Sequence, residues 1–241
     1  MTRRLADSEG RALERCAWGG IRIRCGAGAD QATDLSARAL VRDRRFLKGA
    51  SVCEVGCGSG VLAVLAARLG ASRVLGIDCD PKVLALARRT VRANGVEVEL
   101  VRGDLLAGIR ERFDLIVANL PQKPVPAGHR LPLGQHGGRK GDALLRRFLP
   151  QAVRRLKRGG RLYLFLHTLA PPEVSHLLGK AFRVEVAFWR RRHVPPGEYA
   201  PELVGHWLRL TEKGRAFFHA RPGRPGWHTF YGMKIVAVRR S

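Results

Sequence analysis

Short apolar runs alternate with helical patterns along most of the chain. Seven mostly apolar runs predict β-strands at residues 51–55, 73–78, 96–101, 113–118, 161–166, 182–189 and 233–238. Stretches with apolar residues at helical spacing predict helices at residues 33–49, 61–69, 81–94, 142–157 and 173–180. Near-continuously apolar strands are typical of a parallel sheet that helices cover on both faces. The pattern therefore predicts an α/β fold with a doubly wound, mostly parallel sheet of seven strands.

Two regions fall outside this alternation. Residues 1–32 carry no sustained period apart from a polar–apolar alternation at residues 20–25, which predicts an edge strand. We expect residues 1–32 to lead into a single domain at residues 33–241. Residues 191–230, between the last two strands, hold seven Arg or Lys, three Glu, six aromatic residues and five prolines. This composition predicts a basic, aromatic insertion in the domain.

The charge of the chain is strongly positive. Among 241 residues, 44 are Lys or Arg and 20 are Asp or Glu, so the formal net charge is +24. This charge attracts phosphate polymers such as RNA, acidic proteins or anionic surfaces, although a bias toward arginine along the whole chain explains it equally well. The insertion interleaves basic residues with Tyr199, Trp207 and Trp227, a pairing used in RNA binding. A lid that packs on the sheet through the same rings is the alternative.

Several function classes are excluded on simpler grounds. No apolar run reaches the length of a membrane span, and the first residues lack the apolar core of a signal peptide. We therefore expect a cytoplasmic protein with no membrane partner. The five cysteines are odd in number and form no C-x-x-C pair, so we expect reduced thiols and no metal site.

The sharpest chemical signal is a glycine turn between the first two predicted elements of the alternation. Glu54-Val55-Gly56-Cys57-Gly58-Ser59-Gly60 runs from a strand end into a helix, where glycines allow close approach of a ligand to free N–H groups. Asp78 ends the next strand, where a carboxylate can accept both hydroxyls of a ribose. Asp104 follows the third strand, where an adenine amino group could be held. The glycine turn, Asp78 and Asp104 all follow strand ends on one edge of the sheet, and together they predict a nucleoside-binding site.

The fourth predicted strand leads into Asn119-Leu120-Pro121-Gln122-Lys123-Pro124. Together with the glycine turn and the two acids, this segment resembles the class I S-adenosylmethionine-dependent methyltransferases. The resemblance is greatest to the branch with an N-P-P-[YF] motif, which includes the glutamine-amide (HemK-like) methyltransferases of release factors and the RNA and DNA amino-group methyltransferases. Residues 137–145 and 156–162 resemble that branch's D-G-G-x-D-G-L loop and L-x-P-G-G-x-L turn. The resemblance covers roughly residues 33–190 and implies a Rossmann-like methyltransferase fold.

The resemblance also implies a role for each matching residue. Gly56 and Gly58 would pack under the amino-acid end of S-adenosylmethionine, and Glu54 would help to orient that end. Asp78 would hold the ribose and Asp104 would meet the adenine.

Asn119 and the backbone around Pro121 would face the transferred methyl group, and would accept both N–H protons of an amide or amine acceptor. His129 and His136 lie in the following loop, where either could take a proton or simply face solvent.

This chain departs from the motif at two positions. Leu120 stands where the branch has Pro, and Gln122 stands where it has an aromatic that stacks on a flat acceptor. The segment before the first helix is also too short for the helical recognition domain of bacterial release-factor methyltransferases.

The resemblance implies an enzyme that methylates an amide or amine nitrogen of a protein or small-molecule acceptor. An rRNA or tRNA methyltransferase and a non-catalytic cofactor- or RNA-binding protein are the alternatives. The sequence leaves the acceptor and the oligomeric state open.

Overall fold

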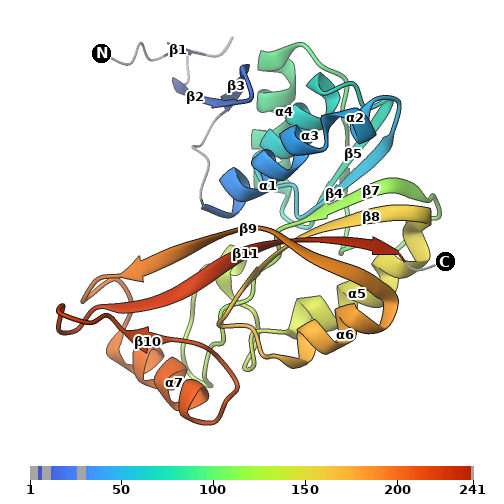
Figure 1. Cartoon of the computed structure of the whole chain (residues 1–241). Helices are drawn as coiled ribbons and strands as arrows, with labels where there is room; N and C mark the ends of the chain where they lie inside the picture. Colours follow the sequence, from blue (N-terminus) through green and yellow to red (C-terminus); the bar gives the residue numbers. More distant parts are fainter. Residues whose placement is uncertain (1–4, 7–11, 26–30, 240–241) are drawn as a thin grey trace.

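The computed structural model describes residues 5–6, 12–25 and 31–239, with side chains placed for most of them (Figure 1). The main sheet contains β4 (Ser51–Val55), β5 (Arg73–Asp78), β6 (Glu99–Arg102), β7 (Phe113–Ala118), β8 (Leu156–His167), β9 (Phe182–Val194), β10 (His219–Ala220) and β11 (His228–Arg239). The helices are α1 (Gln31–Arg42), α2 (Arg44–Leu47), α3 (Val61–Arg68), α4 (Pro81–Asn94), α5 (Ala143–Arg155), α6 (Glu173–Ala181) and α7 (Pro201–Glu212), with a short 3-10 helix at Leu133–Gln135. The predicted α/β fold is confirmed.

The sheet is mostly parallel and its strand order is not sequential. The hydrogen-bonded order is β10-β11-β8-β7-β4-β5-β6, and β9 pairs with β11 along nearly its whole length. Strands β4 to β8 pair in parallel, whereas β11 is antiparallel to β8, β9 and β10. Because β4, β5, β6 and β7 run in parallel, their carboxyl ends meet at one edge. The strand order changes direction at β4, and such sheets bind ligands at that point of this edge.

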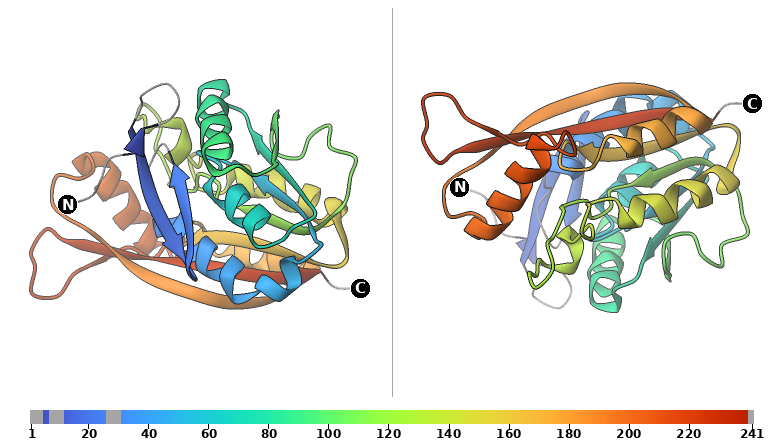
Figure 2. Two further views of the ribbon diagram at one scale, coloured as in Figure 1. Left: turned by 90° about the horizontal axis from the view of Figure 1, so that it is seen from above. Right: turned by 90° about the horizontal axis from the view of Figure 1, so that it is seen from below.

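Helices cover both faces of the sheet (Figures 1 and 2). On one face α5 and α6 pack through Leu145, Phe148 and Leu178 onto the strands. On the other face α1 and α3 bury Leu40 and Leu65. The near-continuous apolar strands thus face two cores, which is the arrangement their sequence predicts.

The sheet has eight strands within the described residues, one more than the seven predicted. The additional strand, β10, lies in the predicted insertion and pairs with the start of β11. Strands β9 and β11 are also longer than predicted, since β9 continues to Val194 and β11 begins at His228. The third predicted strand, at residues 96–101, is shorter and shifted in the structure, where β6 spans Glu99–Arg102.

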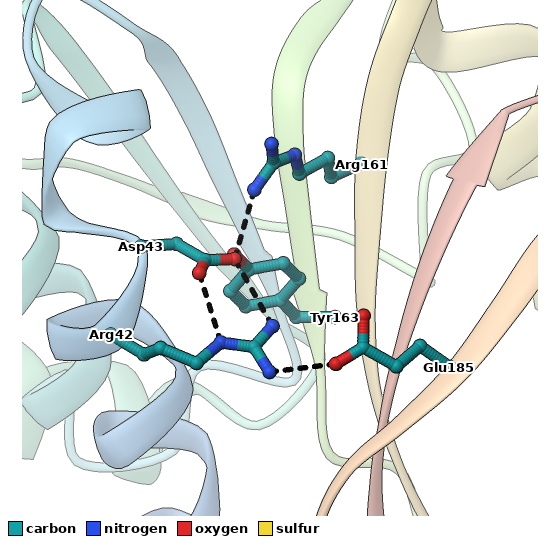
Figure 3. A network of polar contacts seen from close by, with 5 residues as sticks. All are labelled: Arg42, Asp43, Arg161, Tyr163 and Glu185. Atoms are coloured by element: carbon teal, nitrogen blue, oxygen red, sulfur yellow. Dashed lines mark hydrogen bonds and ion pairs between the residues drawn. The ribbon is translucent and has the colours of Figure 1, made fainter.

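The predicted helix at residues 33–49 is broken at Asp43 (Figure 3). The Asp43 carboxylate accepts hydrogen bonds from Arg42 and Arg161, each at 2.9 Å, and from the Tyr163 hydroxyl. Arg42 in turn pairs with Glu185 of β9 at 2.9 Å. The helix break therefore places one carboxylate among partners on β8, which no local helix pattern encodes.

The segment before α1 forms its own small sheet. Strand β2 (Ala12–Trp18) pairs antiparallel with both β1 (Leu5–Ala6) and β3 (Ile21–Cys25), so the strand expected at residues 20–25 exists as one side of a hairpin. Trp18 donates to Asp34 at 3.0 Å and fixes this hairpin to α1. No helix in the described ranges is long and apolar enough to cross a membrane.

Candidate active site

The glycine turn joins β4 to α3 at the carboxyl edge of the sheet. The N–H groups of Gly56 and Cys57 both donate to the Ile77 carbonyl, at 2.8 and 2.9 Å, which ties the turn to the end of β5. Gly56 and Gly60 adopt left-handed φ values of 69° and 76°. A Cβ on Gly60 would meet Ala87 at 3.2 Å, so glycine allows the turn to pack closely against α4.

Glu54 lies beneath this turn and is 5% exposed. Its carboxylate accepts the Ala63 N–H at 2.7 Å, in the first turn of α3, where backbone donors lack helical partners. Burial and the neighbouring Glu54 and Asp78 carboxylates raise the pKa of the Cys57 thiol, so the thiol stays protonated. The structure thus shows Glu54 holding the helix that follows the turn.

Asp78 stands at the end of β5 beside the turn. Its two carboxylate oxygens accept the Gly58 N–H and the Asp80 N–H, both at 3.0 Å. The Gly103 N–H donates to the Asp78 carbonyl at 3.0 Å, which brings the ends of β5 and β6 together. Asp78 is half-buried, so the remaining acceptor capacity of its oxygens is open to a ligand.

Asp104 follows Gly103 at the same edge. Its side chain is 57% exposed and pairs with Arg147 of α5. Leu105, the next residue, has a φ of 55°, the one left-handed non-glycine conformation in the described part of the chain. An adenine held by Asp104 would therefore compete with the Arg147 guanidinium.

The Asn119 segment adjoins the glycine turn. A Cβ on Gly56 would meet Leu120 at 3.3 Å and the Asn119 carbonyl at 3.8 Å, so these two segments touch. Asn119 is half-buried, and its side-chain amide has no hydrogen-bond partner within the described ranges. Pro121 is half-buried two residues further on. The sequence-predicted residues at positions 56, 58, 78, 104 and 119 thus lie along one edge.

Gln122 has a role that sequence reasoning missed. Its side chain is 1% exposed, and its amide nitrogen donates to the carbonyls of Leu120, at 3.1 Å, and Phe165, at 2.7 Å. Its amide oxygen accepts the His167 N–H at 3.3 Å. The Gln122 amide therefore bonds to a backbone carbonyl and a backbone N–H of β8, as a residue of a neighbouring strand would. These bonds attach the Asn119 segment to β8. Gln122 therefore does not project toward an acceptor.

A second loop, which contains Gly137 and Gly138, is hydrogen-bonded to the same segment. Gly137 donates its N–H to the Lys123 carbonyl at 2.9 Å, and Val125 donates to the Gly138 carbonyl at 3.0 Å. A Cβ on Gly137 would come within 2.6 Å of the Gln122 backbone, so only glycine fits there. The loop resembling D-G-G-x-D-G-L therefore determines where the Asn119 segment lies.

Three histidines lie near this segment. His129 contacts the Ala127 carbonyl at 3.3 Å, and His136 accepts the Gly138 N–H at 3.2 Å, so both engage their own loop. His167, which the sequence did not single out, ends β8, and its Nδ1 is buried without a partner in the described structure. Burial, with a smaller effect of Lys123, lowers the pKa of His167 to about 3, so the ring is neutral.

The insertion packs onto the loop after Pro121. Trp207 of α7 is fully buried and donates to the Pro124 carbonyl at 2.8 Å. It shares a cluster with Val125, Leu203 and Phe218. Trp207 is therefore unavailable for stacking on RNA, which corrects one part of the sequence interpretation. The part of the insertion around α7 instead packs its ring inward, as the lid alternative expects.

Two cavities lie at the other end of the strands. One, of about 390 Å³, is lined by residues from Arg42 to Phe46 and by Arg161, at the start of β8's pairing with β7. The other, of about 550 Å³, lies between Ile21 and the ends of α3 and α4. Neither is lined by a residue of the glycine turn.

The residues at the carboxyl edge fit a nucleoside cofactor with an amino-acid tail. Gly58 has a φ of 53° and nothing within 4 Å of a Cβ position, which leaves open space directly over backbone N–H groups. Asp78 supplies a carboxylate one strand away. Fold and site thus agree with the sequence resemblance to the class I S-adenosylmethionine-dependent methyltransferases.

Comparison with known proteins gives the same class. The sequence model of the ribosomal protein L11 methyltransferase (PrmA) family matches residues 23–126, somewhat less than half of the chain. The ribosomal protein L11 methyltransferase of Thermosipho africanus is 43% identical over 96 residues, which cover 39% of this chain and 36% of that protein. The chain thus spans about a third of the length of such relatives.

Two further proteins match more of the chain. The "Putative protein N5-glutamine methyltransferase MJ0928" of Methanocaldococcus jannaschii is 27% identical over 154 residues, covering 61% of this chain and 78% of that protein. The crystal structure of ribosomal protein L11 methylase from Lactobacillus delbrueckii subsp. bulgaricus superposes with a TM-score of 0.54 at 24% identity, covering 87% of this chain and 80% of that chain. The structural likeness concerns the fold.

Proposed function

We propose that the chain transfers a methyl group from S-adenosylmethionine to an amide or amine nitrogen of a protein or small-molecule acceptor. The observation that carries this proposal is the placement of Asn119. Its segment touches the glycine turn at Gly56, and its side-chain amide is free to bind an acceptor. Asn119 and Pro121 are thus the proposed acceptor-binding residues, and Glu54, Gly56, Gly58, Asp78 and Asp104 form the proposed cofactor site.

Methyl transfer from a sulfonium is an in-line displacement, so alignment of the acceptor supplies much of the acceleration. The Asn119 side-chain oxygen and a backbone carbonyl near Pro121 would accept the two N–H protons of a planar nitrogen and direct its lone pair to the methyl carbon. The chain holds these acceptors rigidly, because Gln122 bonds to β8 and Gly137 packs against the Gln122 backbone.

The lack of an aromatic ring at position 122 bears on the class of acceptor that the site can bind. Gln122 has no aromatic ring, and its side chain is buried. A flipped nucleobase therefore has no ring to stack on at this position. The activities for which the relatives are named, ribosomal protein L11 methylation and N5-glutamine methylation of a protein, favour a protein acceptor. An RNA methyltransferase and a non-catalytic binder are the alternatives that the experiment below distinguishes.

We further propose that residues 33–241 act as one catalytic domain in the cytoplasm, and that the insertion near residues 191–230 recognises the acceptor through the part that contains Tyr199 and α7. Support for the insertion comes from Trp207, which holds α7 against Pro124, three residues beyond Pro121. Lys123 connects the two elements again, because it donates to the Tyr199 hydroxyl at 2.7 Å.

The test is transfer of radiolabelled methyl from S-adenosylmethionine into a cell extract that is then separated into protein, RNA and small-molecule fractions. We expect label in the protein or small-molecule fraction, and none with Asn119→Ala enzyme whose cofactor affinity is unchanged. Label in RNA would favour the RNA methyltransferase, and cofactor binding without any label would favour the non-catalytic binder. Full turnover by Asn119→Ala would refute the assigned acceptor site.

A further inference from the structure

The far ends of β9 and β11 extend past the rest of the sheet toward α7 (Figures 1 and 2). We call this part, residues 189–194 and 217–231, the arm. Within the arm, Tyr231 pairs with Arg191, and His219 pairs with Thr229. Because side chains alternate between the faces of a strand, Trp189, Tyr231, Phe217 and His219 share one face of the arm.

Four aromatic rings form a continuous row across that face. The ring centroids lie 5.8 Å apart between Trp189 and Tyr231, 5.6 Å between Tyr231 and Phe217, and 3.8 Å between Phe217 and His219. The row crosses three neighbouring strands, so it joins side chains that lie up to 42 positions apart in the sequence.

The row is exposed although the rest of the insertion is well packed. Trp189 is 62% exposed and Phe217 is 44% exposed. In contrast, Trp207 and Phe218 are fully buried in the cluster beneath the opposite face. The insertion therefore completes its own core without these rings, and the row is an apolar surface left for a partner.

Guanidinium groups lie over two rings of the arm, one in the row and one in the loop that follows β10. Arg191 lies over the Tyr231 ring at 5.7 Å, and Arg221 and Arg224 lie over the Trp227 ring at 5.9 and 5.4 Å. Desolvation, followed by the charges of Arg221 and Arg191, lowers the pKa of His193, which shares a face of β9 with Trp189 and Arg191.

Carboxylates are scarce on the same face. In the described part of the chain no ion pair is found for Arg191, Arg221 or Arg224. The nearby acids are engaged elsewhere: Glu198 pairs with Arg192, and Asp34 pairs with Arg190 at 3.4 Å. The arm thus presents bare rings and unneutralised guanidinium groups together.

We propose that this face of the arm binds single-stranded RNA, with bases on the aromatic row and phosphates on the arginines. Bases stack on exposed rings irrespective of sequence, and guanidinium groups bind phosphate oxygens. Exposed rings beside guanidinium groups that no carboxylate neutralises favour a single-stranded nucleic acid, because its bases and phosphates lie side by side along one strand. This proposal concerns a partner and is independent of which nitrogen the active site methylates.

The test is fluorescence anisotropy of a labelled 12-nucleotide oligouridylate titrated with the full chain, without S-adenosylmethionine. We expect Trp189→Ala to weaken binding about fivefold or more, since one lost base–aromatic stack has at least that effect. Leu133→Ala is the matched control, because Leu133 is 70% exposed and lies outside the arm. It should leave the affinity unchanged.

The arginines are tested by the salt dependence. The double variant Arg221→Gln/Arg224→Gln should reduce the slope of log affinity against log salt by about 1.4, since each phosphate contact on a single strand contributes about 0.7. The control double variant Arg88→Gln/Arg92→Gln removes two exposed charges from α4 and should change the slope far less.

Three results would overturn the proposal, two of them from the variants. One is an unchanged affinity of Trp189→Ala, and the other is equal loss from both arginine pairs, which would mean attraction by net charge alone. Efficient competition by inorganic polyphosphate, which has no bases, would lead to the same rejection. Asp78→Ala should still bind the oligonucleotide, so failure of the cofactor site and failure of the arm are distinguishable.

Discussion

Replacing Asp78 with alanine removes a carboxylate that already has two partners inside the protein. The Gly58 and Asp80 N–H groups each donate to one of its oxygens at 3.0 Å. An ionised carboxylate offers about four acceptor positions, so about two remain for the hydroxyls of a ribose. We therefore expect the substitution to remove two hydrogen bonds to the cofactor and two to the backbone.

The magnitude for cofactor binding follows from these two bonds. A hydrogen bond to a charged group contributes about 1.5–3 kcal/mol, so two contribute about 3–6 kcal/mol. At 1.4 kcal/mol for each tenfold change, Asp78→Ala should raise the dissociation constant about 100-fold to 10,000-fold. Asp78→Asn keeps one oxygen but loses the charge, so we expect its loss to be smaller, about tenfold to 100-fold.

The assay is isothermal titration calorimetry with S-adenosylhomocysteine, which binds without reacting. Asp80→Ala is the matched control, because Asp80 caps α4 by accepting the Lys82 N–H at 2.8 Å. Loss of that cap should cost about 1 kcal/mol of stability and leave the dissociation constant within about twofold. If Asp78→Ala bound within threefold of the unaltered chain, or if both variants lost affinity equally, the ribose assignment would be refuted.

Three other substitutions test contacts that stabilise the fold or support the site. For Asp43, burial raises the pKa, but the surrounding guanidinium and phenol donors outweigh it and hold the pKa below its usual value. The resulting stability is present above the unfolded-state pKa of about 3.9 and is lost as pH falls through the lower folded value. Asp43→Asn should therefore cost about 2 kcal/mol at pH 7, between the exposed and buried limits, and flatten the acid side of a plot of Tm against pH. Trp207→Phe, which loses one buried hydrogen bond, should cost about 1–3 kcal/mol in urea unfolding, whereas exposed Trp189→Phe should change stability by less than about 0.5 kcal/mol. Gly137→Ala should reduce methyl transfer about tenfold or more without loss of cofactor affinity, and Gly134→Ala, which meets nothing within 4 Å, should not.

The cofactor edge was predictable from local sequence because each of its parts is encoded locally. The strands at residues 51–55, 73–78 and 113–118 are predicted with the bounds that the structure shows, since each apolar run is bounded by glycine, charged or asparagine residues. Parallel strands then bring their carboxyl ends to one edge whatever the loops contain. Glu54, Gly58 and Asp78 therefore lie together as expected, while their contacts to a cofactor stay predictions.

The features that sequence reasoning missed depend on partners far along the chain. The break at Asp43 results from hydrogen bonds to residues 118 and 120 positions away, which override the helical pattern of residues 33–49. From the sequence, Gln122 signified only the loss of an aromatic ring. In the structure it bonds to Phe165 and His167 of β8, which lie more than 40 positions further along the chain. A hydrophobic period carries no information about either pairing.

The insertion shows why composition alone could not assign its aromatic residues. Trp207 and Trp189 belong to the same basic and aromatic stretch of chain, yet one is fully buried and the other is 62% exposed. Burial depends on which face of the arm meets α7, and that is decided by the register of β9 on β11, two strands separated by the insertion itself. A slip of β9 by one residue against β11 would turn Arg191 toward the buried cluster and Val194 away from it. The buried cluster under the arm therefore specifies the register, and the register in turn gathers the exposed rings and guanidinium groups on the outer face, where a partner separate from the methyl acceptor can bind.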